Sequence, residues 1–312
     1  MRQVLIRGPW GLGDNIYSRP FVRAAAEQYE LWLDTPWPEL FEDIDIKFVR
    51  GFRGLRTQTN NIALQSEDRW SRPPRAIREM HIHYANIAAS SIIRSLEQRW
   101  YMKLRVRFDP SLFDLPDMGP SPIKSERPIA VIRPVTLRTE WTNPARNPKP
   151  EYINALAAEL MATHTVVAVA SLAEGREWAV GNLPPAHHYF LHEELPVRQL
   201  MALVRDADIV IAGVGWIVPA VLALKTRAFI VLGGNGGHNA PKTITDPRLD
   251  LSRIGFAIPE AYCRCTHMPH ACNKTIADPL GQFAAWRAAI VDRRAADRLD
   301  GPPDTVHGSW QQ

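Results

Sequence analysis

Short apolar runs alternate with amphipathic stretches along most of the chain. Buried strands are predicted for the apolar, β-branched runs at 4–6, 31–33, 129–132, 165–169, 188–191, 208–212 and 228–232. Helices are predicted where apolar side chains recur at a spacing of three to four residues, at 21–26, 85–104, 152–161, 197–204, 219–224 and 284–299. Strands that alternate with helices form parallel sheets covered on both faces, so the pattern predicts an α/β fold.

A proline-rich stretch divides this pattern into two halves. Residues 116–128 contain four prolines and one glycine, a composition that neither a helix nor a central strand accepts. With 312 residues, the chain is long enough for two domains with separate cores. We expect an N-terminal domain at 1–118, a linker at 119–128, a C-terminal domain at 129–280, and a last helix and tail at 281–312.

The glycine-rich turn after the first strand is the strongest candidate for chemistry. It contains Gly11 and Gly13, and Asp14 is its carboxylate. Ser18 is the expected N-cap of the following helix, with Pro20 in the first turn. Because ligands bind outside the carboxyl ends of parallel strands, Asp14 stands where a reaction can take place.

Two simpler interpretations of this turn remain open. It can be an ordinary strand-to-helix connection, because such loops need glycine. It can also be a dinucleotide fingerprint, with Gly11 and Gly13 as the first two glycines and Asp34 for the ribose. The third glycine position is Ile16, however, and an anionic Asp14 would repel a pyrophosphate. The dinucleotide match is therefore weak.

Residues 13–24, with the sequence Gly-Asp-Asn-Ile-Tyr-Ser-Arg-Pro-Phe-Val-Arg-Ala, resemble the N-terminal Gly-Asp…Pro…Ala motif of the ADP-heptose:lipopolysaccharide heptosyltransferase family. Residues 31–33, 38–41 and 44–46 are similar to the family's second strand, helix and third strand. The resemblance implies a GT-B glycosyltransferase, with two Rossmann-like domains facing a cleft and a C-terminal helix that crosses back to the first domain. It also implies that Asp14 is the catalytic base, with Gly13 and Asn15 beside it on the acceptor side.

The second half of the chain supplies candidates for binding a nucleotide sugar. Arg133 follows a predicted strand and Lys149 precedes a predicted helix, and cations at such places suit a diphosphate. The stretch from Arg133 through Trp141 to Tyr152 also resembles the family segment in which a basic residue meets the donor phosphates. Surface charges on a loop are the alternative interpretation.

Two glycine-containing turns complete the predicted donor site. Gly213, Gly215 and Trp216 occupy the place where the family has Asp-Ser-Gly followed by a histidine, and the missing side chains leave the donor sugar open. Backbone without side chains can approach a nucleotide sugar closely, and loop flexibility is the alternative explanation. The second turn consists of Gly233, Gly234, Asn235, Gly236, Gly237 and His238.

Charge is distributed unevenly along the chain. The formal net charge is +4, but residues 47–107 hold thirteen Lys and Arg against four acids, a net +9. Such a stretch favours an anionic partner, with a solvated basic face as the alternative. We expect an anionic acceptor, with hydroxymethylated bases in DNA slightly preferred over a phosphorylated glycolipid. The candidate acceptor contacts are Arg53, Arg56, Arg69, Trp70, Arg72 and Arg75.

All three cysteines lie within ten residues, close to two histidines. A structural zinc site is one interpretation, with Cys263, Cys265, His267 and Cys272 as ligands. A disulfide within the cluster and free thiols in a surface loop are the alternatives. Three cysteines make no disulfide framework, the N-terminus shows no signal-peptide pattern, and no apolar run reaches about 18 residues. We therefore expect a cytoplasmic protein without a transmembrane segment.

The combined expectation is a glycosyltransferase that uses a UDP- or ADP-sugar without a catalytic metal. Asp14 would act as general base on the acceptor hydroxyl, and basic side chains would stabilise the departing diphosphate. A lipopolysaccharide-core heptosyltransferase is the first alternative. The others are an NAD-dependent oxidoreductase, in which Asp34 meets the ribose, and a non-catalytic nucleic-acid-binding protein.

Overall fold

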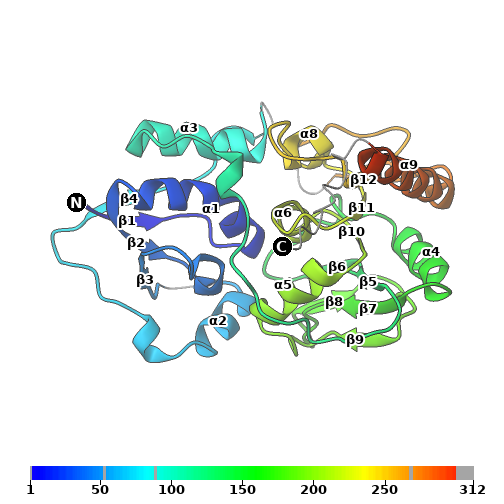
Figure 1. The fold of residues 1–312 in the computed structure, drawn as a ribbon, viewed down its shortest axis with the longest axis horizontal. Helices are drawn as coiled ribbons and strands as arrows, with labels where there is room; N and C mark the ends of the chain where they lie inside the picture. Colours follow the sequence, from blue (N-terminus) through cyan, green and yellow to red (C-terminus); the bar gives the residue numbers. More distant parts are fainter. Residues whose placement is uncertain (1, 52–53, 88–89, 267–269, 300–312) are drawn as a thin grey trace, which may run out of the picture.

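The first lobe is built around a parallel four-stranded sheet. The computed structural model describes residues 2–51, 54–87, 90–266 and 270–299 (Figure 1). The sheet has the strand order β3-β2-β1-β4, with β1 (Arg2–Arg7), β2 (Tyr29–Asp34), β3 (Lys47–Val49) and β4 (Arg78–His81). Its helices are α1 (Leu12–Ala26), α2 (Arg56–Ala63) and α3 (Ile92–Leu104), with short 3₁₀ helices η1 (Pro38–Phe41), η2 (Glu67–Arg69) and η4 (Pro110–Leu112).

The second lobe is built around a parallel six-stranded sheet with the order β12-β11-β10-β5-β7-β9. Its strands are β5 (Ile129–Ile132), β7 (Thr165–Val169), β9 (His188–Phe190), β10 (Ile209–Ala212), β11 (Ala228–Val231) and β12 (Ile254–Ala257). The helices are α4 (Pro150–Met161), α5 (Val197–Asp206), α6 (Ile217–Ala223), α7 (Gly236–Asn239), α8 (Pro241–Ile244) and α9 (Pro279–Leu299). A separate antiparallel pair joins β6 (Thr136–Arg138) to β8 (Glu177–Ala179). The predicted α/β class with parallel sheets is confirmed.

The central strands of the second sheet are buried on both faces. Side chains alternate between the faces of a strand, so Val131 and Val210 pack on one face, together with α5 and α6. Ile132 and Ile211 pack on the other face with α4 and α9. This two-sided burial explains why β5, β10 and β11 are continuous apolar runs in the sequence.

Each sheet has one topological switch point, where the strand order reverses. In the first sheet the chain passes from β1 to β2 and β3 on one side, and β4 then pairs with the other side of β1. In the second sheet β5, β7 and β9 run outward on one side, and β10 returns to the other side of β5. Ligands of open α/β sheets bind in the crevice at such switch points. The loops after β1, β4, β5 and β10 are therefore placed to meet a ligand.

Helix α1 begins earlier than its sequence predicts. It starts at Leu12, directly after the N-cap Gly11, so Ser18 is a buried interior residue and not the cap. Pro20 lies inside the helix, which continues to Ala26 although proline has no N–H for one of the backbone hydrogen bonds. Asp14 therefore occupies the first helical turn, where a carboxylate is favoured by the partial positive charge of the helix N-terminus.

Two further boundaries differ from the sequence prediction. The third strand covers Lys47–Val49 rather than 44–46, because the backbone N–H groups of Ile44 and Ile46 are used in tight turns. Helix α3 begins at Ile92 rather than at residue 85, where Ser91 accepts a cap hydrogen bond from the Arg94 N–H at 3.1 Å.

Helix α1 joins the two lobes by packing on α6. The contact is so close that a Cβ on Gly13 would lie 2.9 Å from Trp216 Cα, which only glycine accommodates. Farther along the helix, the Tyr17 hydroxyl donates to the carbonyl oxygen of Ile244 in the second lobe. Figure 1 shows α1 and α6 facing each other across the middle of the molecule. The N-terminus of α1 is thus fixed against the second lobe.

Polar contacts join helix α2 of the first lobe to the second lobe. The Arg56 guanidinium at the start of α2 pairs with Glu193 at 2.8 Å and donates to Ser171 Oγ at 2.7 Å. Asn60 also donates to Glu193, at 2.6 Å, and the Arg56 N–H donates to Glu140 at 2.8 Å. Arg56 was expected to contact an acceptor, but here it connects the lobes.

Helix α9 packs against the second lobe. Phe283 and Trp286 lie beside Phe229 with ring centroids 5.3 and 5.4 Å away, and α9 also contacts α4 and β12. Figure 1 shows it on the side of this lobe that faces away from the first. The expected crossing of this helix back to the first lobe is therefore absent from its described part, because its aromatic side chains complete the core of the second sheet. Across the described residues, no helix combines the length and apolarity needed to cross a bilayer.

Arg19 is a fully buried cation that holds α1 to its surroundings. Its guanidinium donates to the carbonyl oxygens of Asp114 and Leu40, both at 2.6 Å, and to the Asp43 carboxylate. We expect Arg19→Met to lower the free energy of unfolding by about 3 kcal/mol, because it leaves buried acceptors without donors. Urea denaturation measures this loss. Arg23→Met on the same helix is the control, and an equal loss in both variants would contradict the assigned role.

Candidate active site

A cavity of about 830 Å³ lies between the two lobes. The first lobe contributes the start of α1, the start of α2 and the segment after β4. The second lobe contributes the loops after β5, β7 and β10 and part of the second glycine turn. This volume is in the range of small-ligand sites, roughly 300–1,000 Å³. The switch points of both sheets therefore open into one shared site.

Asp14 stands on the first-lobe wall of the cavity. It is half-buried at the start of α1 and accepts a hydrogen bond from the Tyr84 hydroxyl, which follows β4. The backbone of Gly11 also hydrogen-bonds the carboxylate. Burial raises the pKa of Asp14, while Tyr84, the charge of Arg146 and the Gly11 backbone lower it. Because burial is the largest of these effects, the net pKa is raised, as suits a general base.

The Tyr84 hydroxyl positions this carboxylate and tunes its basicity. Tyr84→Phe removes a hydrogen bond that lowers the pKa of Asp14, so we expect that pKa to rise further. Because only the ionised carboxylate can accept a proton, the acid limb of the kcat/KM profile should move to higher pH. Activity at high pH should fall only a few-fold. A pH profile measures the shift, and an unchanged acid limb would contradict the link between Tyr84 and Asp14.

Two arginines converge on the opposite wall. Arg133 directly follows β5 and Arg146 lies in the next loop. A Cβ on Gly215, after β10, would lie 3.7 Å from Arg133 Nη1 and 3.8 Å from Arg146 Nη2. Within the described residues neither guanidinium has a carboxylate within 4 Å, and Arg146 Nε is buried without a hydrogen-bond partner. Two adjacent cations with unused donors form a site for an anion with several oxygens.

Burial changes the acidity of both arginines. It lowers the pKa of Arg133, and burial together with the charge of Arg133 lowers the pKa of Arg146 to about 10. Both side chains remain charged at neutral pH. The charges of Glu177 and Asp14 act against this lowering at Arg133 and Arg146 respectively, and a bound anion would add to their effect. Trp141 lies beside Arg146, with its ring centroid 5.0 Å from the guanidinium carbon, and offers a flat surface to the same space.

The structure brings together only part of the predicted donor site. Arg133, Gly215, Trp216, Asn235 and His238 line the cavity. Lys149 does not, and its ammonium lies 3.4 Å from Thr275 Oγ1. Gly213 packs against Pro148 instead of facing the cavity, since a Cβ there would lie 3.0 Å from Pro148 Cδ. The other residues outside the lining are Gly233, Gly234, Gly236 and Gly237.

These four glycines pack closely against neighbouring protein atoms and not against the open cavity. A Cβ on Gly233 would lie 2.2 Å from the Asn147 carbonyl oxygen, and one on Gly234 would lie 2.2 Å from Cys272 Cβ. Gly236 and Gly237 donate their backbone N–H groups to the carbonyl oxygens of Cys263 and Cys265, at 2.8 and 3.0 Å. So many glycines are therefore needed at this turn because it packs closely against residues 145–147 and 262–272.

The predicted acceptor residues are scattered. Gly13 lines the cavity, and Asn15 lies behind it, where it donates to the carbonyl oxygens of Pro9 and Gly11 and shapes the turn. Arg69 pairs with Glu42 at 2.7 Å. Arg56 bonds to Glu193 of the second lobe, Trp70 is half-buried, and Arg53 lies outside the described residues.

Arg72 and Arg75 are exposed in the segment that precedes β4. This segment meets the amino-terminal edge of the first sheet, whereas Asp14 follows the carboxyl end of β1. The basic stretch is therefore not gathered at the cavity. Several of its members are instead neutralised by Glu30, Glu42, Glu67 and Glu193.

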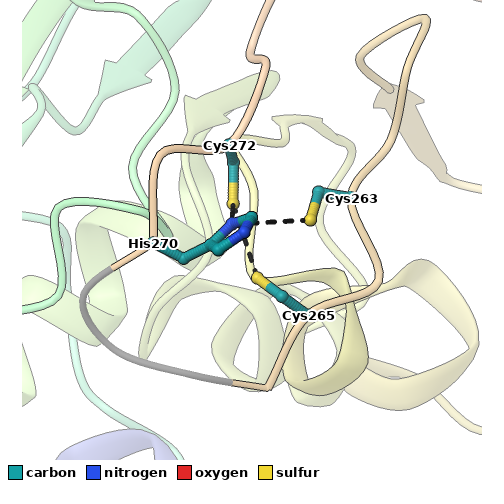
Figure 2. A group of neighbouring side chains, drawn as sticks. All are labelled: Cys263, Cys265, His270 and Cys272. Atoms are coloured by element: carbon teal, nitrogen blue, oxygen red, sulfur yellow. Dashed lines mark hydrogen bonds between the residues drawn. The ribbon is translucent and has the colours of Figure 1, made fainter.

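The cysteine loop brings four metal-type ligand atoms together. Figure 2 shows the side chains of Cys263, Cys265, His270 and Cys272 pointing toward one another. Their ligand atoms all lie within 4.8 Å of each other, and the three thiols are free. The predicted fourth ligand, His267, lies outside the described residues, and His270 holds the corresponding place.

The structure does not support the dinucleotide interpretation, because Asp34 is already engaged within the protein. Asp34, which would bind the ribose, is buried at the end of β2 and pairs with Arg7 at 2.7 Å. Its carboxylate oxygen is therefore engaged beneath the turn and is not part of the cavity lining. The cavity also lies between the lobes, whereas a dinucleotide site at this turn would lie on the first lobe alone.

Several solved structures with a similar fold are described as glycosyltransferases. E. coli ADP-heptose LPS heptosyltransferase II matches with a TM-score of 0.59 and 14% identity, over 94% of this chain and 100% of that chain. The dodecameric iron-containing heptosyltransferase TibC, solved with ADP-D-beta-D-heptose, gives 0.58 and 16%, over 93% and 77%.

A glycosyl transferase family 9 protein from Veillonella parvula gives a TM-score of 0.51 at 8% identity, over 93% of this chain and 97% of that chain. No protein-family model and no curated protein matches the sequence. At such identities the likeness concerns the fold, and the predicted GT-B fold, similar to that of the heptosyltransferases, is confirmed.

Proposed function

We propose that this protein is a glycosyltransferase that moves a sugar from a nucleoside diphosphate to an acceptor hydroxyl. The observation that carries the proposal is the pairing of opposite charges across the cavity. A carboxylate with a raised pKa, Asp14, faces two half-buried arginines, Arg133 and Arg146, which have no carboxylate within 4 Å among the described residues. A base on one wall and a diphosphate site on the other are the groups that glycosyl transfer requires.

The proposed reaction assigns one role to each wall. Asp14 removes the proton from the acceptor hydroxyl while that oxygen attacks the anomeric carbon of the donor sugar. The bond between this carbon and the diphosphate oxygen breaks, and the leaving group takes the bonding electrons. Arg133 and Arg146 bind the negative charge that develops on the diphosphate, which is the kind of preorganised stabilisation that gives the largest rate effects.

The donor is proposed to be an ADP- or UDP-sugar, with ADP-heptose as the first compound to test. Support comes from two proteins of the same fold that are described as ADP-heptose enzymes. Residues 213–216, with the sequence Gly-Val-Gly-Trp, contain no Asp, Ser or His, whereas the heptosyltransferase motif has Asp-Ser-Gly followed by a histidine at this turn. The sugar itself therefore requires a panel of donors.

The acceptor is proposed to be an anionic glycan, such as a phosphorylated glycolipid of the lipopolysaccharide core. The sequence-based preference for hydroxymethylated DNA rests on the net charge of +9 over residues 47–107. Arg56 and Arg69 are instead paired with acids, and Arg72 and Arg75 lie at the opposite edge of the first sheet. This placement favours a compact acceptor over a duplex.

A ligand panel followed by product analysis tests the proposal. Binding to the native state raises its stability by mass action, so ADP, UDP or their sugars should raise the melting temperature. Mass spectrometry should then detect sugar transfer to a phosphorylated lipopolysaccharide core and not to a hydroxymethylated duplex. Removal of the phosphates from the core should reduce this transfer. Stabilisation by NAD alone would sink the glycosyltransferase assignment, and transfer to the duplex would restore DNA as the acceptor.

A further inference from the structure

The cysteine loop (residues 263–272) contains a set of ligands with the dimensions of a metal site. Cys265 Sγ lies 3.5 Å from Cys272 Sγ, and His270 Nδ1 lies 3.6 Å from Cys263 Sγ and 3.1 Å from Cys272 Sγ. With Zn–S near 2.3 Å and Zn–N near 2.0 Å, a tetrahedron has S···S edges of about 3.8 Å and S···N edges of about 3.5 Å. The observed distances approach these values.

We propose that Cys263, Cys265, His270 and Cys272 hold one tetrahedral metal ion that fixes the donor wall of the cavity. Three thiolates and one imidazole favour zinc, with thiolate-bound iron as the other ion of this chemistry. All four coordination positions are filled by protein, so the ion is structural and binds no substrate. His270 is exposed, which provides an entry path for the ion.

Hydrogen bonds connect the ligands directly to the second glycine turn. The Asn235 N–H donates to Cys272 Sγ at 3.4 Å, as backbone N–H groups often do toward metal-bound thiolates. The two following N–H groups, of Gly236 and Gly237, donate to the carbonyl oxygens of Cys263 and Cys265. Three successive backbone groups of the turn are therefore held by three ligand residues.

The same turn supports residues that line the cavity. Asn235 has a left-handed backbone conformation, with φ of 53°, and both Asn235 and His238 face the cavity. On its other side, Gly234 donates its N–H to the Ala145 carbonyl at 2.7 Å, next to Arg146. Lys274, just beyond the cysteine loop, donates to the carbonyl of Pro144 at 2.5 Å. The ion thus supports the backbone that presents Arg146.

Metal content and ligand number provide the first test. The full-length protein, purified without chelator, should contain one equivalent of zinc or iron by elemental analysis, and the element found identifies the ion. Replacement by Co²⁺ should give an absorption spectrum with thiolate-to-cobalt charge transfer from three sulfurs. His270→Ala should reduce the metal content well below one equivalent, His270→Cys should retain it, and His267→Ala should leave it unchanged.

Several outcomes would overturn the metal site. Protein that has been supplied with zinc and iron during expression but contains neither would do so. A disulfide between two of the cysteines in the purified protein, detected by mass spectrometry, would do so as well. Equal metal loss in His267→Ala and His270→Ala would overturn the assigned ligand set, because that set gives the fourth position to His270 alone.

The link to the donor wall rests on the proposed function and has its own readout. Removal of the ion by a chelator, or by His270→Ala, should weaken ADP or UDP binding at least ten-fold by calorimetry, and His270→Cys should restore it. Equal nucleotide affinity with and without the ion would overturn the link. If the purified protein contains the metal but binds no nucleotide, the glycosyltransferase proposal fails and the metal site stands. If nucleotide binds and no metal is found, the reverse holds.

Discussion

Asp14→Asn should lower kcat by about 10³-fold, because a positioned general base contributes on the order of 10²–10⁴. The amide keeps the shape of the side chain and can still accept the Tyr84 hydrogen bond, but it cannot take a proton. Nucleotide affinity should be preserved, since the arginines on the opposite wall are unchanged. Steady-state kinetics with the donor identified by the ligand panel, together with calorimetry, measure the two effects separately.

The stability of the same variant supplies a control. Because burial raises the pKa of Asp14 in the folded state, its ionised form opposes folding. The contribution of this residue to stability is largest below the pKa of the unfolded chain and falls as the pH rises through the folded pKa. At neutral pH, Asp14→Asn should therefore keep or raise the melting temperature. A folded variant with undiminished kcat would contradict the role of Asp14 as base.

Arg146→Ala should have the second largest effect, a fall in kcat/KM of about 10²–10³-fold, as for the loss of one preorganised donor to a developing charge. Two of its nitrogens are available, Nη2 beside Gly215 and the unpartnered Nε. Loss of charged hydrogen bonds worth about 1.5–3 kcal/mol should weaken ADP or UDP binding roughly 10- to 100-fold. Calorimetry and kinetics measure these changes.

Lys149 is the matched control for Arg146. Both cations lie in the segment between β6 and α4, but only Arg146 lines the cavity. Lys149→Ala should therefore change kcat/KM and nucleotide affinity by less than about two-fold. Arg146→Lys should recover only part of the loss, since an ammonium lacks the planar fork of a guanidinium. Similar losses in Lys149→Ala and Arg146→Ala would contradict the diphosphate site described here.

The parallel sheets were predictable from sequence because their central strands are buried on both faces. Residues 129–132 and 209–212 are uninterrupted apolar runs, and the structure buries every one of them. Strand β4 was not predictable, since only Met80 among its four residues is buried. Helix α9 kept its predicted periodicity, but periodicity does not say which lobe its apolar face covers.

The site was predictable only where local sequence determines position. Asp14 follows a strand and begins a helix, so its place at a switch point could be predicted from neighbouring residues alone. Tyr84 follows the unrecognised strand β4, and its meeting with Asp14 requires the pairing of β4 with β1. The choice of Arg146 over Lys149 depends on how one irregular loop turns, which no periodic pattern encodes. The spacing of the two histidines in the sequence also could not indicate that His270 meets the three thiols.

The four glycines of the second turn also affect how this protein can change over generations. In three of them, Gly234, Gly236 and Gly237, the missing side chain makes room for the cysteine loop, and Gly234 in particular leaves only enough space for Cys272. A lineage that lost the cysteines would release these positions to larger residues, and a later return of the cysteines would then find no room. These three glycines and the cysteines should therefore be inherited or lost as one unit, and an engineer who transplants the turn into another enzyme has to transplant both segments.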